Sequence, residues 1–285
     1  PLGAYAKLVY DIPFSIRMHN VEWMIWERYK SRLRKYSPQW FFIKRQAELL
    51  KRSEARYFKM ADVCFAVTEQ DKKYALETSP KANIKVATIG VDEKKWNPKE
   101  NIERNDNELI LCTSYKWVHN IEAVKWLIEY VMPILEDKFS DIKLTLIGKN
   151  MPNWIINHDD PHINPLGYVE DVKPHLNKAG IYVAPLFVGS GIRVKILEAL
   201  AMKLPVIATT ISAEGIYKDN GENNGLFIAD DAQSFAGKII DLLENKELLK
   251  QSRKNAKKFV HENYNWLKNI KIMYNTYKEI SSAQD

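Results

Sequence analysis

The stretch 184–200 combines residue types that suit the binding of a phosphate. An apolar run, typical of a buried β-strand, leads into Gly189-Ser190-Gly191. A helix with apolar periodicity is expected next, with Arg193 and Lys195 in its first turns. The free N–H groups and the positive dipole end of a helix favour an anion, as do these cations. The spacing indicates a nucleotide-diphosphate pocket or, equally, an ordinary strand–loop–helix of an α/β protein.

Glu198 is the carboxylate of this stretch. It follows Gly191 by seven residues, which predicts that both lie on one helix face, about 10 Å apart. This is about the span from a diphosphate to a ribose, whose hydroxyls an ionised carboxylate binds by accepting hydrogen bonds. The alternative for Glu198 is an exposed helix glutamate.

The composition indicates a globular protein with a sizeable core. The chain has 285 residues, enough for about two domains, with 46% apolar and 27% charged residues. Cys64 and Cys112 each lie in an apolar run, which predicts buried reduced thiols and a cytoplasmic location. His158 and His162 flank Asp159-Asp160-Pro161, so a loop is expected there and no metal site.

The positive charge is concentrated in residues 28–59. The net charge of the chain is +6, whereas this segment has 11 Lys or Arg residues against two acidic ones. Aromatic residues interleave with them: Tyr36, Trp40, Phe41, Phe42 and Tyr57. This pattern predicts contact with an anionic membrane surface, at its cytoplasmic face, or with an anionic substrate, and the alternative is a solvated helix face. No nucleic-acid recognition motif accompanies the charge, so nucleic acid is not expected.

The order of elements predicts parallel sheets. Before residue 93 about three strands are expected, at 12–18, 63–68 and 84–89, and residue 38 is expected to break a long helical region. Residues 93–107 have a linker composition. Strands and helices then alternate, which indicates an α/β domain whose ligands collect at the carboxyl ends of the strands. Five loops should line that crevice, after Thr113, Gly148, Leu166, Pro185 and Thr209.

Residues 185–209 resemble the C-terminal domain of retaining glycosyltransferases of the large group-1 class (family four). The order of the family's landmarks is kept along the chain, in residues 17–22, 56–92, 113–124, 146–150, 165–172 and 212–216. The resemblance implies the GT-B fold, an α/β architecture of two Rossmann-like domains. It also implies that the chain lacks roughly the first 90 residues of the family, so donor binding with little transfer is expected of it.

The resemblance divides the chain into four parts. Residues 1–92 would form a partial N-terminal, acceptor-side domain, and residues 93–107 a linker. Residues 108–262 would form a complete nucleotide-sugar-binding domain. The helix expected at 263–285 would pack back on the N-terminal domain.

The resemblance also assigns roles to individual residues. Catalytic roles fall to His19, Arg193 and Glu198. Donor-binding positions are Ser114, Lys116, Gly148, Tyr168, Val169, Gly189, Ser190, Gly191, Lys195 and Glu198. Asn120 is expected to contact ligand or to cap the next helix, and His119 to have no role beyond a surface or helix position. Ser190 stands where many members have a glutamate, so backbone N–H groups are expected to replace that carboxylate.

The activity implied is retaining, metal-independent transfer of a sugar from a nucleotide-diphosphate donor to a glycan or lipid-linked acceptor. Such a reaction needs no cofactor, because cations and backbone dipoles stabilise the departing diphosphate. Cell-envelope or surface polysaccharide synthesis is the expected setting. A non-catalytic nucleotide-sugar-binding or scaffold protein is the alternative.

Overall fold

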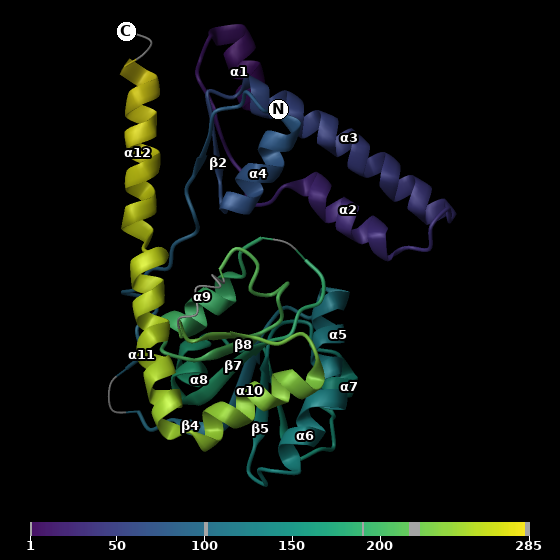
Figure 1. Cartoon of the computed structure of the whole chain (residues 1–285), viewed down its shortest axis with the longest axis vertical. Helices are drawn as coiled ribbons and strands as arrows, with labels where there is room; N and C mark the ends of the chain where they lie inside the picture. Colours follow the sequence, from purple (N-terminus) through teal and green to yellow (C-terminus); the bar gives the residue numbers. More distant parts are fainter. Residues whose placement is uncertain (1, 100–101, 190, 217–222, 283–285) are drawn as a thin grey trace. The chain divides into compact units, whose positions relative to one another are not determined.

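The structure is a computed structural model that describes residues 2–99, 102–189, 191–216 and 223–282, without the side chain of residue 32 (Figure 1). The chain divides into two compact units. The first comprises Pro1–Gly90, Ser190–Ile192 and Trp266–Asp285, and the second comprises Val91–Gly189 and Arg193–Asn265.

The first unit contains a parallel sheet of three short strands in the order β1-β2-β3. The strands are β1 (Ser15–Arg17), β2 (Val63–Ala66) and β3 (Ile84–Val86). The strand predicted at 12–18 is shorter than expected. Pro13 has no N–H for the ladder, and the Phe14 N–H donates to the Asp62 side chain at 2.9 Å, so pairing starts at Ser15.

The helices that the structure describes in this unit are α1 (Leu2–Tyr10), α2 (Glu22–Arg32), α3 (Pro38–Met60), α4 (Glu69–Thr78) and α12 (Trp266–Ser282). The predicted break at Pro38 is confirmed. Pro38 occupies the first turn of α3, and the Ser37 side chain caps the helix by accepting from the Trp40 N–H at 3.2 Å. Helices α2 and α3 form a long hairpin (Figure 1).

Helix α12 covers one face of the small sheet. Its Met273 and Ile280 pack against a buried cluster made of Val63, Phe65 and Ala87. The Tyr277 ring meets Phe65 edge-on at 5.5 Å, and its hydroxyl lies 3.1 Å from Ser15 Oγ. The last helix of the chain therefore completes the core of the first sheet.

The second unit contains a parallel six-stranded sheet in the order β6-β5-β4-β7-β8-β9. Its strands are β4 (Asn105–Cys112), β5 (Lys143–Ile147), β6 (Ile163–Gly167), β7 (Ala179–Ala184), β8 (Val206–Ala208) and β9 (Leu226–Ile228). Strand β4 begins inside the predicted linker 93–107, so that expectation was wrong for its last three residues. The polar residues Asn105–Asn107 form the first, less buried part of β4, and the buried part of the strand is apolar.

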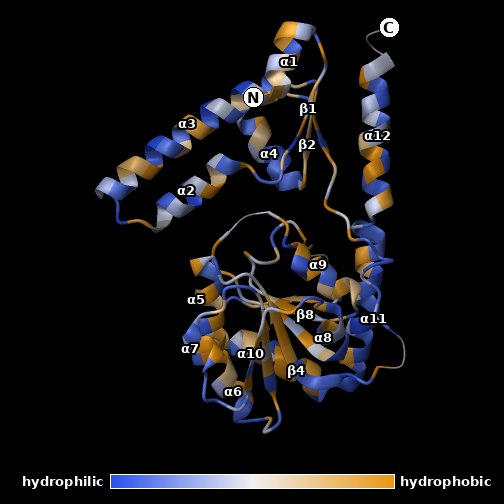
Figure 2. Cartoon of the chain, turned by 180° about the vertical axis from the view of Figure 1, so that it is seen from behind, coloured by the Kyte–Doolittle hydropathy of each residue, from blue (hydrophilic) through white to orange (hydrophobic). Residues whose placement is uncertain are grey.

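Helices flank this sheet. They are α5 (Val118–Trp126), α6 (Met132–Glu136), α7 (Asn153–Ile156), α8 (Lys173–Lys178), α9 (Val194–Ala201), α10 (Ala232–Glu244) and α11 (Lys246–Asn263). A π-helical turn, η1 (Leu127–Val131), joins α5 to α6. Figure 2 shows the apolar strands at the centre of this unit, where Leu109, Leu144 and Ile181 are fully buried.

In the described part of the chain, no helix combines the length and apolar character required to span a membrane.

Candidate functional site

The strand order of the second unit identifies one end of its sheet as a binding position. Connections leave β4 in one direction along the sheet, through β5 and β6, and leave β7 in the other, through β8 and β9. Sheets of this order bind ligands outside the carboxyl ends of the strands at the point of reversal. In this unit, that point lies between the loops after β4 and β7.

Gly148 ties the loops on the β5–β6 side together. Its N–H donates to the Gly167 carbonyl at 2.7 Å, and the Tyr115 N–H donates to the Lys149 carbonyl at 3.0 Å. Gly148 has φ +155°, and a Cβ there would lie 1.7 Å from the Thr113 carbonyl oxygen. Only glycine permits this approach of the loops after β4, β5 and β6.

The predicted base-side residues come together at these loops. Lys149 Nζ lies 4.5 Å from the centre of the Tyr168 ring, which is 61% exposed. Val169 follows it and is half-buried. The exposed ring and the neighbouring backbone leave a surface on which a flat base can stack.

Two buried hydroxyls that the sequence interpretation did not single out hold the loop after β7. The Leu186 N–H donates to Ser212 Oγ at 2.8 Å, and Thr209 Oγ1 donates to the Leu186 carbonyl. Both hydroxyl residues are at most 1% exposed and follow β8. In the sequence, the position of these two polar residues directly after an apolar strand could have indicated this role.

Helix α9 begins at Val194, and Arg193 occupies its N-cap position, so Gly191 lies outside the helix. Gly189 and Gly191 have φ +138° and +80°, which no L-residue in a helix adopts. Gly191 and Glu198 therefore do not share a helix face. Ser190, a predicted donor contact, lies outside the described residues.

Arg193 lies against the glycine loop. A Cβ on Gly189 would come 2.0 Å from Arg193 Nη2, so the missing side chain makes room for the guanidinium. Arg193 is half-buried. This arrangement puts a positive group against the loop that follows β7.

Glu198 and Lys195 form an ion pair on α9. Lys195 Nζ lies 3.0 Å from Glu198 Oε2, and the two side chains are 52% and 13% exposed. The charges of both act on Cys112, the last residue of β4, whose pKa is raised to about 12 by burial above all. The Glu198 carboxylate is thus close to the carboxyl end of β4, next to the reversal point.

His119 is a site residue that the sequence interpretation dismissed. Burial lowers its pKa, as does the positive charge of Arg193. Its ring stacks on Trp117, with centroids 6.2 Å apart and an interplanar angle of 18°. The neutral imidazole, able to donate a hydrogen bond, therefore shares the region of Arg193. Its place two residues after Trp117, just beyond β4, was the signal.

Asn120 supports the loop after β4. Its Nδ2 donates to the Ser114 carbonyl at 2.8 Å, and its side chain is buried. The residue that caps α5 is Trp117, so the expectation that Asn120 caps the helix was wrong. Lys116, which directly precedes Trp117, is exposed.

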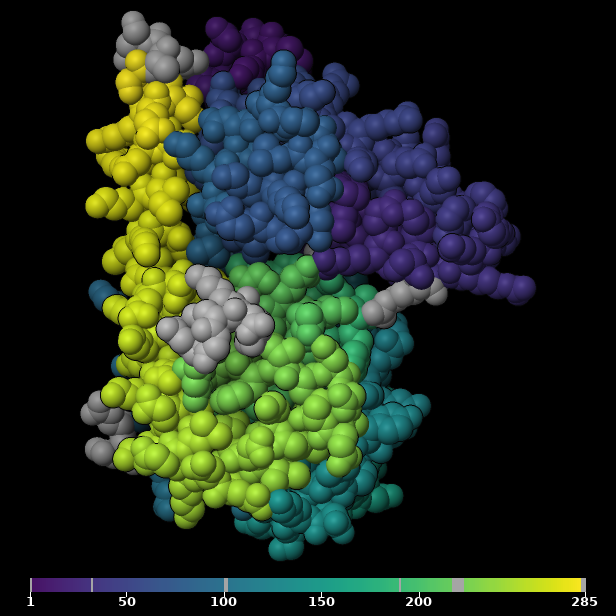
Figure 3. All heavy atoms as spheres, viewed as in Figure 1, coloured from purple at the N-terminus to yellow at the C-terminus, as the bar shows by residue number. Residues whose placement is uncertain are grey.

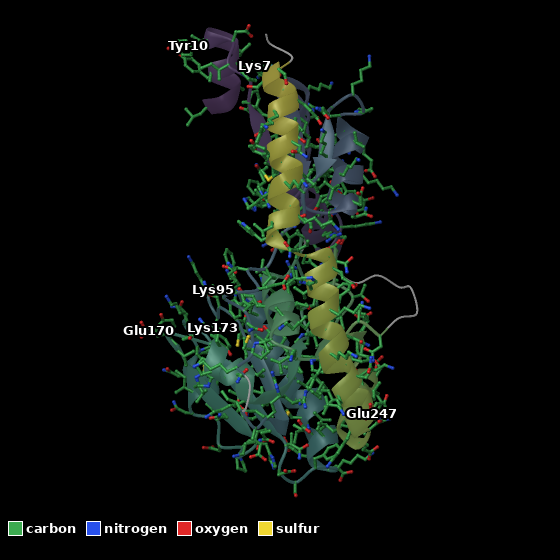
Figure 4. All side chains as sticks on the ribbon, turned by 90° about the vertical axis from the view of Figure 1, so that its left-hand side faces the viewer. Lys7, Tyr10, Lys95, Glu170, Lys173 and Glu247 are labelled. Atoms are coloured by element: carbon green, nitrogen blue, oxygen red, sulfur yellow. The ribbon has the colours of Figure 1, made fainter. Side chains whose placement is uncertain are left out.

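Trp96, from the segment predicted to be a linker, lies beside α9. Lys195 Nζ is 5.9 Å from its ring centre, and Lys173 Nζ is 6.0 Å from it. Figure 4 labels Lys95 and Lys173 on this side of the unit, where both contribute to a lowered pKa of Asp171. The tryptophan in this otherwise polar run could have indicated that the segment packs against the second unit.

The remaining predicted catalytic residue belongs to the other unit. His19 is exposed and lies two residues after β1. The site in the second unit thus combines cations, a neutral imidazole, a carboxylate and an exposed aromatic ring. That set can bind an anion, a hydroxyl-bearing ring and a flat base.

Comparison with known sequences finds similarity over much of the second unit. Residues 107–245 match the sequence model of the group 1 glycosyl transferases. An uncharacterised 44.6 kDa protein from the cps region of Klebsiella pneumoniae is 29% identical over 56% of this chain and 42% of its own length. A phosphatidyl-myo-inositol mannosyltransferase of Mycolicibacterium smegmatis is 25% identical over 53% of this chain and 40% of its own. The chain thus spans less than half the length of these relatives.

The fold of the chain also matches solved structures. The HepE protein of Anabaena, solved in complex with UDP, superposes with a TM-score of 0.71 at 12% identity. The match covers 98% of this chain and 75% of HepE. The GT-B fold expected from the sequence is confirmed.

Proposed function

Because the chain carries a group 1 glycosyltransferase domain on a GT-B fold, we propose that it is part of a retaining, metal-independent glycosyltransferase. The donor is a nucleotide-diphosphate sugar, and the acceptor is a glycan or a lipid-linked molecule of the cell envelope. The observation that carries this proposal is the reversal of strand order between β4 and β7, with Arg193 and Glu198 beside it.

The donor diphosphate binds at the glycine loop and the start of α9. Negative charge grows on this group as the glycosidic bond breaks, and Arg193 stabilises it with help from Lys195 and Lys116. Backbone N–H groups of the loop, including that of Gly189, add fixed dipoles. These contacts supply the stabilisation for which other transferases use a metal ion.

The nucleoside extends from there toward the loops after β5 and β6. The Glu198 carboxylate, whose Oε2 lies 3.0 Å from Lys195 Nζ, accepts hydrogen bonds from the ribose hydroxyls. The base stacks near Tyr168 and meets the backbone of Gly148 and Val169. The neutral His119 donates a hydrogen bond to the sugar or the phosphate.

Activity with a panel of UDP, GDP and ADP sugars tests the proposal. We expect at least one donor to be bound and to be hydrolysed or transferred, with retention visible by NMR of the product. Binding without any turnover would favour the scaffold alternative, and a lack of binding to every donor would reject both.

The acceptor side of the proposal includes a membrane contact through residues 28–59. At the turn between α2 and α3, Tyr36, Trp40 and Phe41 form an aromatic cluster, with ring centroids 5.1–6.4 Å apart. Tyr36 and Phe41 are 75% and 55% exposed, and Lys44 lies over the Trp40 ring. Figure 3 shows part of the outer surface of this hairpin. Exposed rings next to cations suit the interface of an anionic bilayer.

Vesicle sedimentation tests this contact. The chain should bind vesicles containing phosphatidylglycerol more strongly than vesicles of phosphatidylcholine, and the double variant Trp40→Ser, Phe41→Ser should lose most of that binding. Tyr130→Ser, which alters an exposed ring of the second unit, is the control. Equal sedimentation of the double variant and the control would contradict the contact.

A further inference from the structure

A second cluster of chemically active side chains lies at the opposite end of the six-stranded sheet. Glu136 ends α6, whose chain continues to the start of β5, and Asp160 and His162 precede the start of β6. One carboxylate oxygen from each acid and one ring nitrogen of the histidine all lie within 4.8 Å of one another. The cluster is therefore at the amino ends of the strands, away from the donor site.

The histidine is oriented as in a metal site. His162 Nδ1 lies 2.7 Å from the Ile142 carbonyl oxygen, which can only accept. Nδ1 therefore carries the proton, and Nε2 keeps its lone pair. Histidines that bind metals are commonly held by such a bond from the other ring nitrogen to a backbone carbonyl.

The glutamate supplies an independent observation. Glu136 Oε1 is buried and has no hydrogen-bond partner among the described residues. A buried carboxylate oxygen without a partner is costly, and the Asp160 carboxylate beside it adds repulsion. A cation bound between the two carboxylates removes both costs.

We propose that Glu136, Asp160 and His162 bind one divalent transition-metal cation of the zinc or manganese type. One imidazole and two carboxylates suit these ions better than calcium or magnesium, which prefer oxygen ligands alone. Metal–ligand bonds of about 2.0–2.2 Å require the side chains to close in slightly around the ion. The ion joins the connection between α6 and β5 to the connection between α7 and β6, and its role is structural.

Zinc titration of the chelator-treated full chain by calorimetry tests the site. We expect one saturable zinc ion per chain and a rise in melting temperature of several degrees at zinc concentrations well above Kd. The variants Glu136→Gln, Asp160→Asn and His162→Gln should each weaken binding at least tenfold. Asp159→Asn, the same charge change on the exposed neighbour, and His175→Gln should leave it unchanged.

Cobalt supplies a readout that does not depend on stability. Co²⁺ should give a saturable visible absorption band in the wild type that is absent in His162→Gln, with circular dichroism confirming that the variant is folded. The absence of saturable zinc binding, or equal loss in Asp159→Asn and Asp160→Asn, would overturn the proposal. Nucleotide binding should be the same in all these variants, so failure here leaves the proposed transferase function untouched.

Discussion

Both units contain a parallel sheet, but the two sheets differ in the number of strands and in the helices that cover them. The first sheet has three strands of three or four residues and relies on α12, from the end of the chain, to cover its core. The second has six strands, its own flanking helices and a reversal of strand order. The reversal point proposed as the donor site therefore lies in the second unit, whereas the first unit contains the basic hairpin of α2 and α3. The comparison predicts that the contacts of Arg193 and Glu198 within the second unit determine donor binding.

The largest expected effect is at the glycine that joins the loops of the second unit. Gly148→Val would push a side chain into the Thr113 carbonyl oxygen, which would lie 1.7 Å from the added Cβ, and into the Tyr115 ring. We expect a loss of at least about 3 kcal/mol in the free energy of unfolding, measured by urea denaturation. Gly237→Ala in α10, where no atom lies within 4 Å of the added Cβ, should instead gain about 0.5–1 kcal/mol. Similar losses in both variants would refute the close-approach argument.

A smaller effect is expected where α12 completes the first sheet. Tyr277→Ala removes the ring contact with Phe65 and the hydroxyl contact with Ser15, which should cost about 1–2 kcal/mol in the first unit. Tyr274→Ala, at an exposed ring on the same helix, should cost less than about 0.5 kcal/mol. Hydrogen exchange separates the units: protection should fall in β2 and stay unchanged in β4. A uniform fall in both sheets would contradict the independence of the first core.

The smallest effect compares the buried cysteine of each sheet. Burial raises the pKa of both Cys64 and Cys112 to about 12. Neither thiol should react with a disulfide reagent at pH 8 until its sheet opens, and Cys64 should react faster because its core is smaller. The unfolded thiols release their protons at about pH 8.5–9, so stability should fall as pH rises above that range. Faster labelling of Cys112 would reverse the predicted order of stability.

Much of the second unit was predictable from the sequence because its apolar runs and glycine loops carry local signals. The alternation of strands and helices after the linker, and the parallel sheet that it implies, are present in the structure. Glu198 and Gly148 followed from spacing and from the resemblance. Their positions in the structure agree with a donor site, while their roles remain predictions.

The missed features depend on contacts between distant segments. Gly191 does not share a helix face with Glu198, because Gly189 and Gly191 adopt positive φ before α9 begins, which no periodicity encodes. The role of His119 depends on the charge of Arg193, which lowers the pKa of His119 and lies more than seventy residues later in the sequence. The Glu136–Asp160–His162 cluster was also hidden, because the short spacing of His158 and His162 drew attention to the wrong pair.

The most direct test of the central claim is nucleotide binding by the second unit's residues. UDP and GDP should be titrated into the full chain and into Arg193→Ala, Glu198→Gln and Glu129→Gln, the last being an exposed helix glutamate paired with Lys125 at 3.5 Å. We predict saturable binding of at least one nucleotide, weakened about 10- to 100-fold in the first two variants, as loss of a charge-assisted hydrogen bond implies. Glu129→Gln should bind as the wild type does. Unchanged affinity in Arg193→Ala and Glu198→Gln, or no binding of either nucleotide by the wild type, would contradict a donor site at the reversal point of the six-stranded sheet.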